Sequence, residues 1–104
     1  MFVFTRGVDE WIVIGDDIYV APTDIDDKSV RLIAKGRMLG GPSDGGTFQT
    51  VHELTKGQSF PIGPMIQITL VEVRRGSVRV GINCPPHMAL HRKESPNSIK
   101  EDKE

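Results

Sequence analysis

The chain matches itself when Ile14 is laid over Ile62, and in this register the two copies align without a gap. Matched positions share apolar character, a glycine or a whole tripeptide, and they are Ile14/Ile62, Gly15/Gly63, Ile18/Ile66, Val20/Ile68, Ile25/Val73, Ser29-Val30-Arg31/Ser77-Val78-Arg79 and Leu32/Val80. Strand and turn chemistry shared by chance is the alternative explanation, but the unbroken register favours an internal duplication. The fold is therefore expected to be built from two related halves.

Each half consists of short segments that alternate apolar and polar residues or form brief apolar runs, separated by Gly, Pro or Asp. No segment keeps the i, i+3, i+4 spacing of an amphipathic helix, so the predicted fold class is all-β. Strands are predicted at Phe2–Arg6, Trp11–Ile14, Asp17–Asp24, Ser29–Lys35, Thr47–Leu54, Gln58–Ile62, Met65–Val73, Ser77–Asn83 and Met88–His91. Hairpin turns are predicted at Asp26-Asp27-Lys28 and at Arg74-Arg75-Gly76, where glycine can take a positive φ.

One half of the chain, about 45 residues, would bury too little surface to be stable on its own, so the halves should share one core. The predicted organisation is a single all-β domain over residues 1–94, with a first repeat (1–36), a Gly-rich loop (37–46) and a second repeat (47–94). The polar residues 95–104 are predicted to form a short tail, frayed or helical.

Charged side chains nearly cancel, since 13 basic and 14 acidic residues give a formal net charge of -1. Binding of nucleic acid would then require a local basic patch, because the chain as a whole does not attract polyanions. The single cysteine excludes an internal disulfide, the first residues lack a signal-peptide pattern, and no apolar run approaches the roughly 18 residues that span a bilayer. A cytoplasmic protein without a membrane partner is expected.

Sequence patterns typical of enzymes and metal sites are missing. There is no Gly-rich phosphate loop after a strand, no nucleophile elbow, and no His beside Ser or Cys in a catalytic pattern. The acidic residues between Asp16 and Asp27 lack the ligand spacing and terminal Glu of a calcium loop and are interpreted as solvated turns. No paired zinc-ligand spacing joins the remaining candidates, which are His52, His87, His91 and Cys84. We expect a binding protein with no catalytic residues, no metal and no cofactor.

Two stretches of sequence carry a resemblance to a known family. The first is Met1-Phe2-Val3-Phe4-Thr5-Arg6 with Ile14-Gly15-Asp16-Asp17-Ile18 after it. The second is Ser77-Val78-Arg79-Val80-Gly81-Ile82-Asn83-Cys84-Pro85 followed by Leu90-His91-Arg92-Lys93-Glu94. They are similar to the opening strands, and to the fourth strand, Asn-x-Pro turn and fifth strand, of the carbon storage regulator (CsrA/RsmA) family of bacterial RNA-binding translational regulators. The resemblance covers residues 1–35 and 58–94.

This resemblance implies a dimer-like fold of interleaved strands, here made as a pseudo-dimer by one fused or duplicated chain. It implies binding of GGA-containing single strands or hairpin loops in messenger RNA or small regulatory RNA, at a surface where the first strand of one unit lies beside the fifth strand of the other. The family's two RNA-binding arginines match Arg6 and Arg92. Arginine suits this role because its planar guanidinium can stack on a base and donate paired hydrogen bonds. The residues expected to bind RNA are Phe4, Thr5, Arg6, Leu90, His91 and Arg92, with Arg74 and Arg75 as candidate phosphate contacts.

The two halves differ from each other at the positions that matter for RNA. The register of the repeat places Leu54 where the first half has Arg6, and the first half has no Asn-x-Pro turn or His-Arg-Glu ending. The segment Thr47–Glu53 would have to serve both as fifth strand of the first half and as first strand of the second, and it places Glu53 near the arginine position. A carboxylate repels phosphate, so one RNA site per chain is predicted.

Plainer interpretations stay open at this stage. Arg6 can be an edge-strand charge that prevents aggregation, and Arg74 and Arg75 can be an ordinary exposed turn. The chain can also be a degenerate paralogue without RNA affinity that acts through protein contacts, with an ordinary family subunit or a protein antagonist as partner. A monomer is preferred over a homodimer that swaps the same strands between chains.

Overall fold

The computed structural model describes residues 1–37 and 47–93, and within these ranges the chain forms strands and no helix. The strands are β1 (Phe2–Arg6), β2 (Trp11–Ile14), β3 (Ile18–Ile25), β4 (Ser29–Arg37), β5 (Thr47–Thr55), β6 (Ser59–Ile62), β7 (Ile66–Arg74), β8 (Ser77–Asn83) and β9 (Leu90–Lys93). Each predicted strand is present, and the all-β prediction is confirmed. Most of the predicted Gly-rich loop (38–46) and the predicted tail (95–104) lie outside the described residues.

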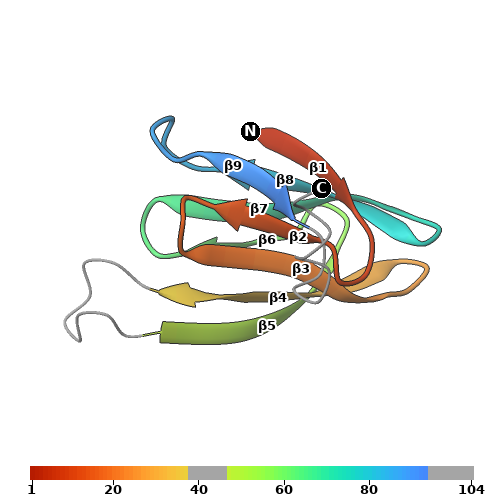
Figure 1. Cartoon of the computed structure of the whole chain (residues 1–104). Coiled ribbons are helices and arrows are strands. Elements are labelled where there is room, and N and C mark those ends of the chain that lie inside the picture. Colours follow the sequence, from red (N-terminus) through yellow and green to blue (C-terminus); the bar gives the residue numbers. More distant parts are fainter. Residues whose placement is uncertain (38–46, 94–104) are drawn as a thin grey trace, which may run out of the picture.

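The strands form two antiparallel sheets that face each other (Figure 1). One sheet has the order β1-β8-β7-β6, and the other has the order β5-β4-β3-β2-β9. The halves exchange strands, because β1 of the first half pairs with β8 of the second, while β5 and β9 of the second half flank β4 and β2 of the first. The predicted interleaved pseudo-dimer is therefore confirmed.

The two halves repeat each other in detail. Ile14 pairs with Ile18 across the first hairpin, and Ile62 pairs with Ile66 across the equivalent one. The ladder between β3 and β4 shifts register between Pro22 and Asp24, and the ladder between β7 and β8 shifts between Leu70 and Glu72, which are the matching positions of the repeat. Such a bulge bends and twists a strand. The same bulge at the same place gives both halves the same curvature, so they can pack around one core.

The core lies between the sheets and receives inward-facing side chains from both of them. Its members follow the period-two alternation expected of strands with one buried face. Those with less than 2% exposure are Ile12, Ile14, Val20, Val30, Leu32, Ala34, Ile68, Leu70, Val78, Val80 and Ile82. Each branched side chain among them contributes about 1.5–3 kcal/mol by leaving water. Neither half could close this core alone, since each of the two sheets contains strands from both halves.

No helix in the described part of the chain has the length and apolar character needed to cross a membrane.

Candidate nucleic-acid interface

Strands β1 and β9 lie at the same side of the molecule, at the edges of different sheets (Figure 1). They are not paired with each other, since β1 pairs with β8 and β9 pairs with β2. A side-chain contact links them: the guanidinium carbon of Arg92 lies 5.8 Å from the ring centroid of Phe4. This is a cation–π distance. The structure thus brings together the beginning and the end of the sequence-predicted site.

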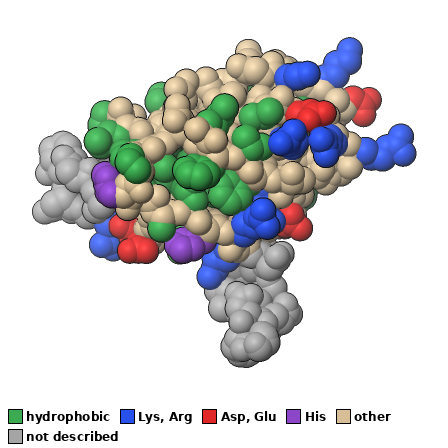
Figure 2. Space-filling model, turned by 90° about the horizontal axis from the view of Figure 1, so that it is seen from above, with side chains coloured by type: hydrophobic (Ala, Val, Ile, Leu, Met, Phe, Trp, Pro, Cys, Tyr) green, Lys and Arg blue, Asp and Glu red, His purple; other side chains and the backbone are tan. Residues whose placement is uncertain are grey.

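The side chains of this surface combine apolar and cationic character. Phe4 and Leu90 are half-buried, whereas Thr5, His91 and Arg92 are exposed. Figure 2 looks onto this side of the molecule and shows hydrophobic side chains gathered in the middle of the face. An exposed arginine beside aromatic and aliphatic side chains can stack on an unpaired base and donate hydrogen bonds to it.

Pairing with β2 fixes the position of β9. Ile12 lies opposite Arg92 and Ile14 opposite Leu90, and the Gly15 amide donates to the Ala89 carbonyl at 2.8 Å. The prediction that this strand begins at Met88 was wrong. The Met88 amide donates to the Pro85 carbonyl at 3.0 Å and closes a turn, so pairing begins only at Leu90 and extends to Lys93.

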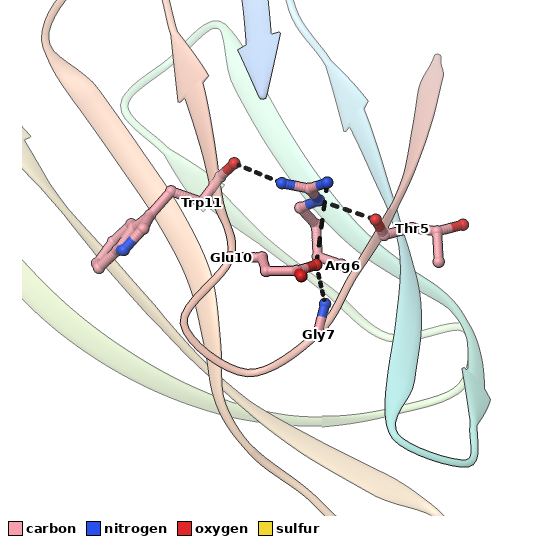
Figure 3. A network of polar contacts seen from close by, with 5 residues as sticks. All are labelled: Thr5, Arg6, Gly7, Glu10 and Trp11. Atoms are coloured by element: carbon pink, nitrogen blue, oxygen red, sulfur yellow. Dashed lines mark hydrogen bonds and ion pairs between the residues drawn. The ribbon is translucent and has the colours of Figure 1, made fainter. Parts of the chain in front are cut away.

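Arg6 points inward and is only 8% exposed. Its Nη1 donates to the Trp11 carbonyl at 3.2 Å, its Nε donates to the Thr5 carbonyl at 2.8 Å, and its Nη2 lies 3.9 Å from Glu10 Oε1. Glu10 Oε1 also accepts the Gly7 amide at 2.8 Å (Figure 3). The guanidinium therefore ties the end of β1 to the start of β2, and most of its donors are turned away from the exposed face.

A basic hairpin lies next to the end of β1. Arg6 pairs with Val78 of β8, so the end of β1 comes close to the turn between β7 and β8. A Cβ placed on Gly7 would lie 3.4 Å from the Gly76 carbonyl, and Gly76 has a φ of 78°, as the predicted turn requires. In Figure 2, Lys and Arg side chains gather at the right, the end at which this hairpin lies in Figure 1.

The hairpin carries more positive than negative charge. Arg74 Nη2 lies 3.4 Å and Arg79 Nη1 3.6 Å from the same Glu72 carboxylate oxygen, while Arg75 is exposed at the turn. The hydrogen bond and charge of Arg74, with a smaller contribution from Arg79, lower the pKa of Glu72 below its ordinary value. Three arginines against one carboxylate leave a positive surface beside β1.

The opposite side of the molecule has the equivalent backbone but different chemistry. Leu54 takes the place of Arg6 and is buried opposite Val30. His52 takes the place of Phe4 and stacks on Phe60, with ring centroids 3.8 Å apart and planes 9° apart. Glu53 is exposed beside them. This side therefore presents a carboxylate where the β1 side has Thr5, and a buried aliphatic side chain where it has Arg6.

The hairpin on this opposite side is acidic. Asp26 and Asp27 of the β3–β4 turn occupy the positions of the repeat that Arg74 and Arg75 occupy in the second half, and both are exposed. The β5 strand ends beside this turn, with Thr55 opposite Ser29. The charge of the two hairpins is thus opposite in sign at matching positions.

The described part of the chain places no strand beside β6, although β9 occupies the equivalent position beside β2. Pro61 gives a physical reason. The Leu70 amide donates to the Gln58 carbonyl, so ladder bonds fall at every second residue of β6 and the nitrogen of Pro61 faces the open edge. Val13 is the equivalent residue and faces β9, opposite His91. Proline has no N–H to donate to a neighbouring strand.

Residues 54–101, in the second half of the chain, match the family model described as CsrA, the global regulator protein family. The second half of the chain is therefore similar to the carbon storage regulator family. The Translational regulator CsrA of Clostridium acetobutylicum is 45% identical over 47 residues, which cover 45% of this chain and 64% of that protein. The protein of the same name from Clostridium botulinum strain Loch Maree is 43% identical over 47 residues, covering 45% of this chain and 65% of the relative. The chain thus spans less than two thirds of the curated relatives that it matches. No solved structure is significantly similar to it.

Sequence reasoning missed the residues that hold the ends of β1 and β5 in place. Glu10 and Gln58 occupy matching positions of the two halves, and each accepts a backbone amide three residues earlier, from Gly7 and Thr55 respectively, at 2.8 Å. The internal repeat contained this signal as a Glu/Gln pair in the same register. The burial of Arg6 had no such signal, because it depends on how the loop after β1 folds back.

The metal-ligand types are dispersed in the structure. Within residues 1–37 and 47–93, no three His, Cys, Asp or Glu side chains are grouped so as to hold a metal ion. Cys84 is half-buried, and burial raises the pKa of its thiol. A raised thiol pKa lowers the fraction of reactive thiolate at neutral pH.

Proposed function

We propose that the chain binds GGA-containing single-stranded or hairpin-loop RNA at the surface formed by β1, β9 and the β7–β8 hairpin, and regulates translation by covering that RNA. The observation that carries this proposal is the meeting of exposed Arg92 with Phe4 beside a hairpin of three arginines. The curated relatives are named translational regulators, which supports the same function.

The residues of this surface have different proposed roles in RNA binding, which follow from how exposed each side chain is. Arg92 and His91 are exposed and stack on or donate hydrogen bonds to bases, Thr5 is exposed beside them, and half-buried Phe4 and Leu90 form the floor. Base contacts of this kind give sequence preference. Arg6 holds β1 in place from beneath, because its guanidinium is buried and already bonded to backbone carbonyls.

Arg74 and Arg75 extend the surface with phosphate contacts. Both are exposed on the hairpin beside the end of β1, and Glu72 neutralises only part of the positive charge there. Such contacts add affinity without sequence preference and make binding salt-dependent. They also explain how a chain of net charge -1 can attract RNA, since the charge that matters is local.

One RNA site per chain follows from the difference between the two sides. The side of β5 carries Glu53 and the aspartates of the β3–β4 turn, and the edge of β6 carries Pro61 where a fifth strand would pair. Repulsion of phosphate and loss of a strand both act against RNA there. The conventional family arrangement implied by the resemblance would have two equal sites.

A gel-shift assay with a GGA hairpin tests this function. We expect a shift with that RNA and none, at the same protein concentration, with a hairpin in which GGA is changed to CCA. The variant Arg92→Ala should lose the preference, whereas Arg37→Ala, an exposed arginine at the far end of β4, serves as the charge-matched control and should keep it. Equal binding of both hairpins, or no binding of either, would contradict the proposal and favour a protein that acts through protein contacts.

A further inference from the structure

The two sheets have four edge strands among the described residues, and they differ in how well they are protected from pairing with another chain. Unprotected edges are templates for strand addition, and proteins blunt them with short strands, cations or proline. β9 has four residues and carries His91, Arg92 and Lys93, while β6 has four residues with the nitrogen of Pro61 facing outward. β1 has five residues.

The edge strand β5 has none of these protections. It has nine residues, Thr47–Thr55, with no proline, lysine or arginine. Its outer face carries Val51, whose exposed fraction is 55%, high for a valine. A long edge strand rich in β-formers is the part of this fold best suited to pair with another strand.

The ladder phase shows which backbone groups of β5 are open. The Asp26 amide donates to the Ser29 carbonyl, so odd-numbered residues of β4 bond to β3 and even-numbered ones bond to β5. Since Leu32 lies opposite His52, the even-numbered residues of β5 bond to β4. The odd-numbered residues therefore turn their N–H and C=O groups outward. Gln58 Oε1 accepts the Thr55 amide, and the outward amides of Thr47, Gln49, Val51 and Glu53 face the open edge.

We propose that β5 pairs antiparallel with β5 of a second copy of this chain, with a two-fold axis at Val51. This register overlaps all nine residues, because Val51 is the middle residue of Thr47–Thr55. Val51 then meets its own counterpart, and Gln49 lies opposite Glu53 of the other copy, on both sides of the axis. All three have outward backbone groups, so they fall at hydrogen-bonded positions.

Charge disfavours the alternative register that is centred on Glu53. A two-fold axis at Glu53 would place two carboxylates opposite each other, which is destabilising. With the axis at Val51, the only charged side chain of the pair, Glu53, meets a Gln amide that can donate a hydrogen bond to it. The strand is complementary to itself, which is what a two-fold symmetric interface requires.

The dimer leaves the proposed RNA surface open. β5 lies at the edge of the molecule opposite to β1 and β9 (Figure 1). Two chains joined at β5 would therefore carry two RNA surfaces facing away from each other. This consequence rests on the proposed function, and it would restore two sites per particle, with increased affinity for RNAs that contain two GGA motifs.

Molar mass in solution, measured by light scattering over a range of protein concentrations, tests the dimer. The wild-type mass should rise from 11.5 kDa to twice that value as concentration increases. Gln49→Glu places carboxylates opposite Glu53 at two points and should raise the dimer dissociation constant roughly two- to thirty-fold, whereas Gln49→Lys should lower it. Both changes fall on one exposed side chain and leave the backbone unchanged.

Val51→Pro tests the backbone pairing directly. It removes an outward N–H, as Pro61 does on β6, and should give a monomer at all concentrations, while Val51→Thr keeps the N–H and should still dimerise. A wild-type chain that stays at 11.5 kDa, or a dimer indifferent to both Gln49 variants, overturns the proposal. Gel shifts on the same variants distinguish the RNA-binding proposal from the dimer proposal. A monomeric Val51→Pro variant that still prefers GGA supports RNA binding independently of dimerisation.

Discussion

Replacing Arg6 with alanine should destabilise the fold more than it changes the RNA surface itself. The guanidinium makes a buried hydrogen bond to the Trp11 carbonyl and a partly buried one to the Thr5 carbonyl. A hydrogen bond from a charged group contributes about 1.5–3 kcal/mol and a less buried one about 0.5–1.5 kcal/mol. The Glu10 partner lies 3.9 Å away and its side chain is 42% exposed, so this ion pair adds little. The sum predicts that Arg6→Ala lowers the free energy of unfolding by about 2–4.5 kcal/mol.

Urea denaturation followed by circular dichroism measures this loss, read as a lower midpoint at unchanged slope. Arg74→Ala is the matched control, since that side chain is 52% exposed and its contact with Glu72 lies at the surface. It should change the free energy of unfolding by less than about 0.5 kcal/mol. Arg6→Lys should fall between the two, because a lysine cannot reproduce the paired geometry of Nε and Nη1. If Arg6→Ala were no more harmful than Arg74→Ala, the structural role of Arg6 would be refuted.

The remaining predictions concern the RNA surface and the pH dependence of stability. Arg92→Ala should weaken binding of a GGA hairpin by about 1–3 kcal/mol in a fluorescence titration, with unchanged unfolding. Arg75→Ala should weaken GGA and CCA hairpins alike and reduce the slope of log affinity against log salt by about 1, whereas Asp27→Ala, its acidic counterpart, should leave the slope unchanged. Val13→Pro should abolish GGA binding, because it removes the N–H that faces β9 and detaches that strand. Burial lowers the pKa of His52 from 6.5. Because the unfolded chain then binds this proton more readily, His52 favours the folded state above pH 6.5, and this contribution is lost as the pH falls through the lowered pKa. Replacing His52 with glutamine should therefore make the free energy of unfolding, measured by urea titration, less dependent on pH in that range.

Much of the fold could be predicted from the sequence, because local alternation and the internal repeat both reflect backbone geometry. The match of Ser29-Val30-Arg31 with Ser77-Val78-Arg79 predicted two equivalent hairpins, and the structure gives them the same bulge as well as the same turn position. The end of the chain was predicted less well. Met88 has strand-like character, but the prolines before it close a turn that delays β9 to Leu90.

The proposed RNA surface was harder to predict, because side-chain direction depends on tertiary contacts. Arg6 and Arg92 look equivalent in the sequence as arginines at strand ends. In the structure Arg92 is exposed over Phe4, whereas the loop through Glu10 folds back over Arg6 and buries it. The role of Pro61 could not be predicted either. Only the hydrogen bond between Gln58 and Leu70 shows that the Pro61 nitrogen faces the edge of β6 that no described strand covers.

The number of RNA molecules bound per chain tests most directly whether the two halves are unequal. A GGA hairpin should be titrated, at a concentration well above its dissociation constant, against a known concentration of folded chain, with binding followed by isothermal calorimetry. We expect one hairpin per chain, whether the chains are single or joined at β5. Two equal sites per chain would contradict this expectation and show that Glu53, Pro61 and the acidic hairpin do not prevent RNA binding on the second side.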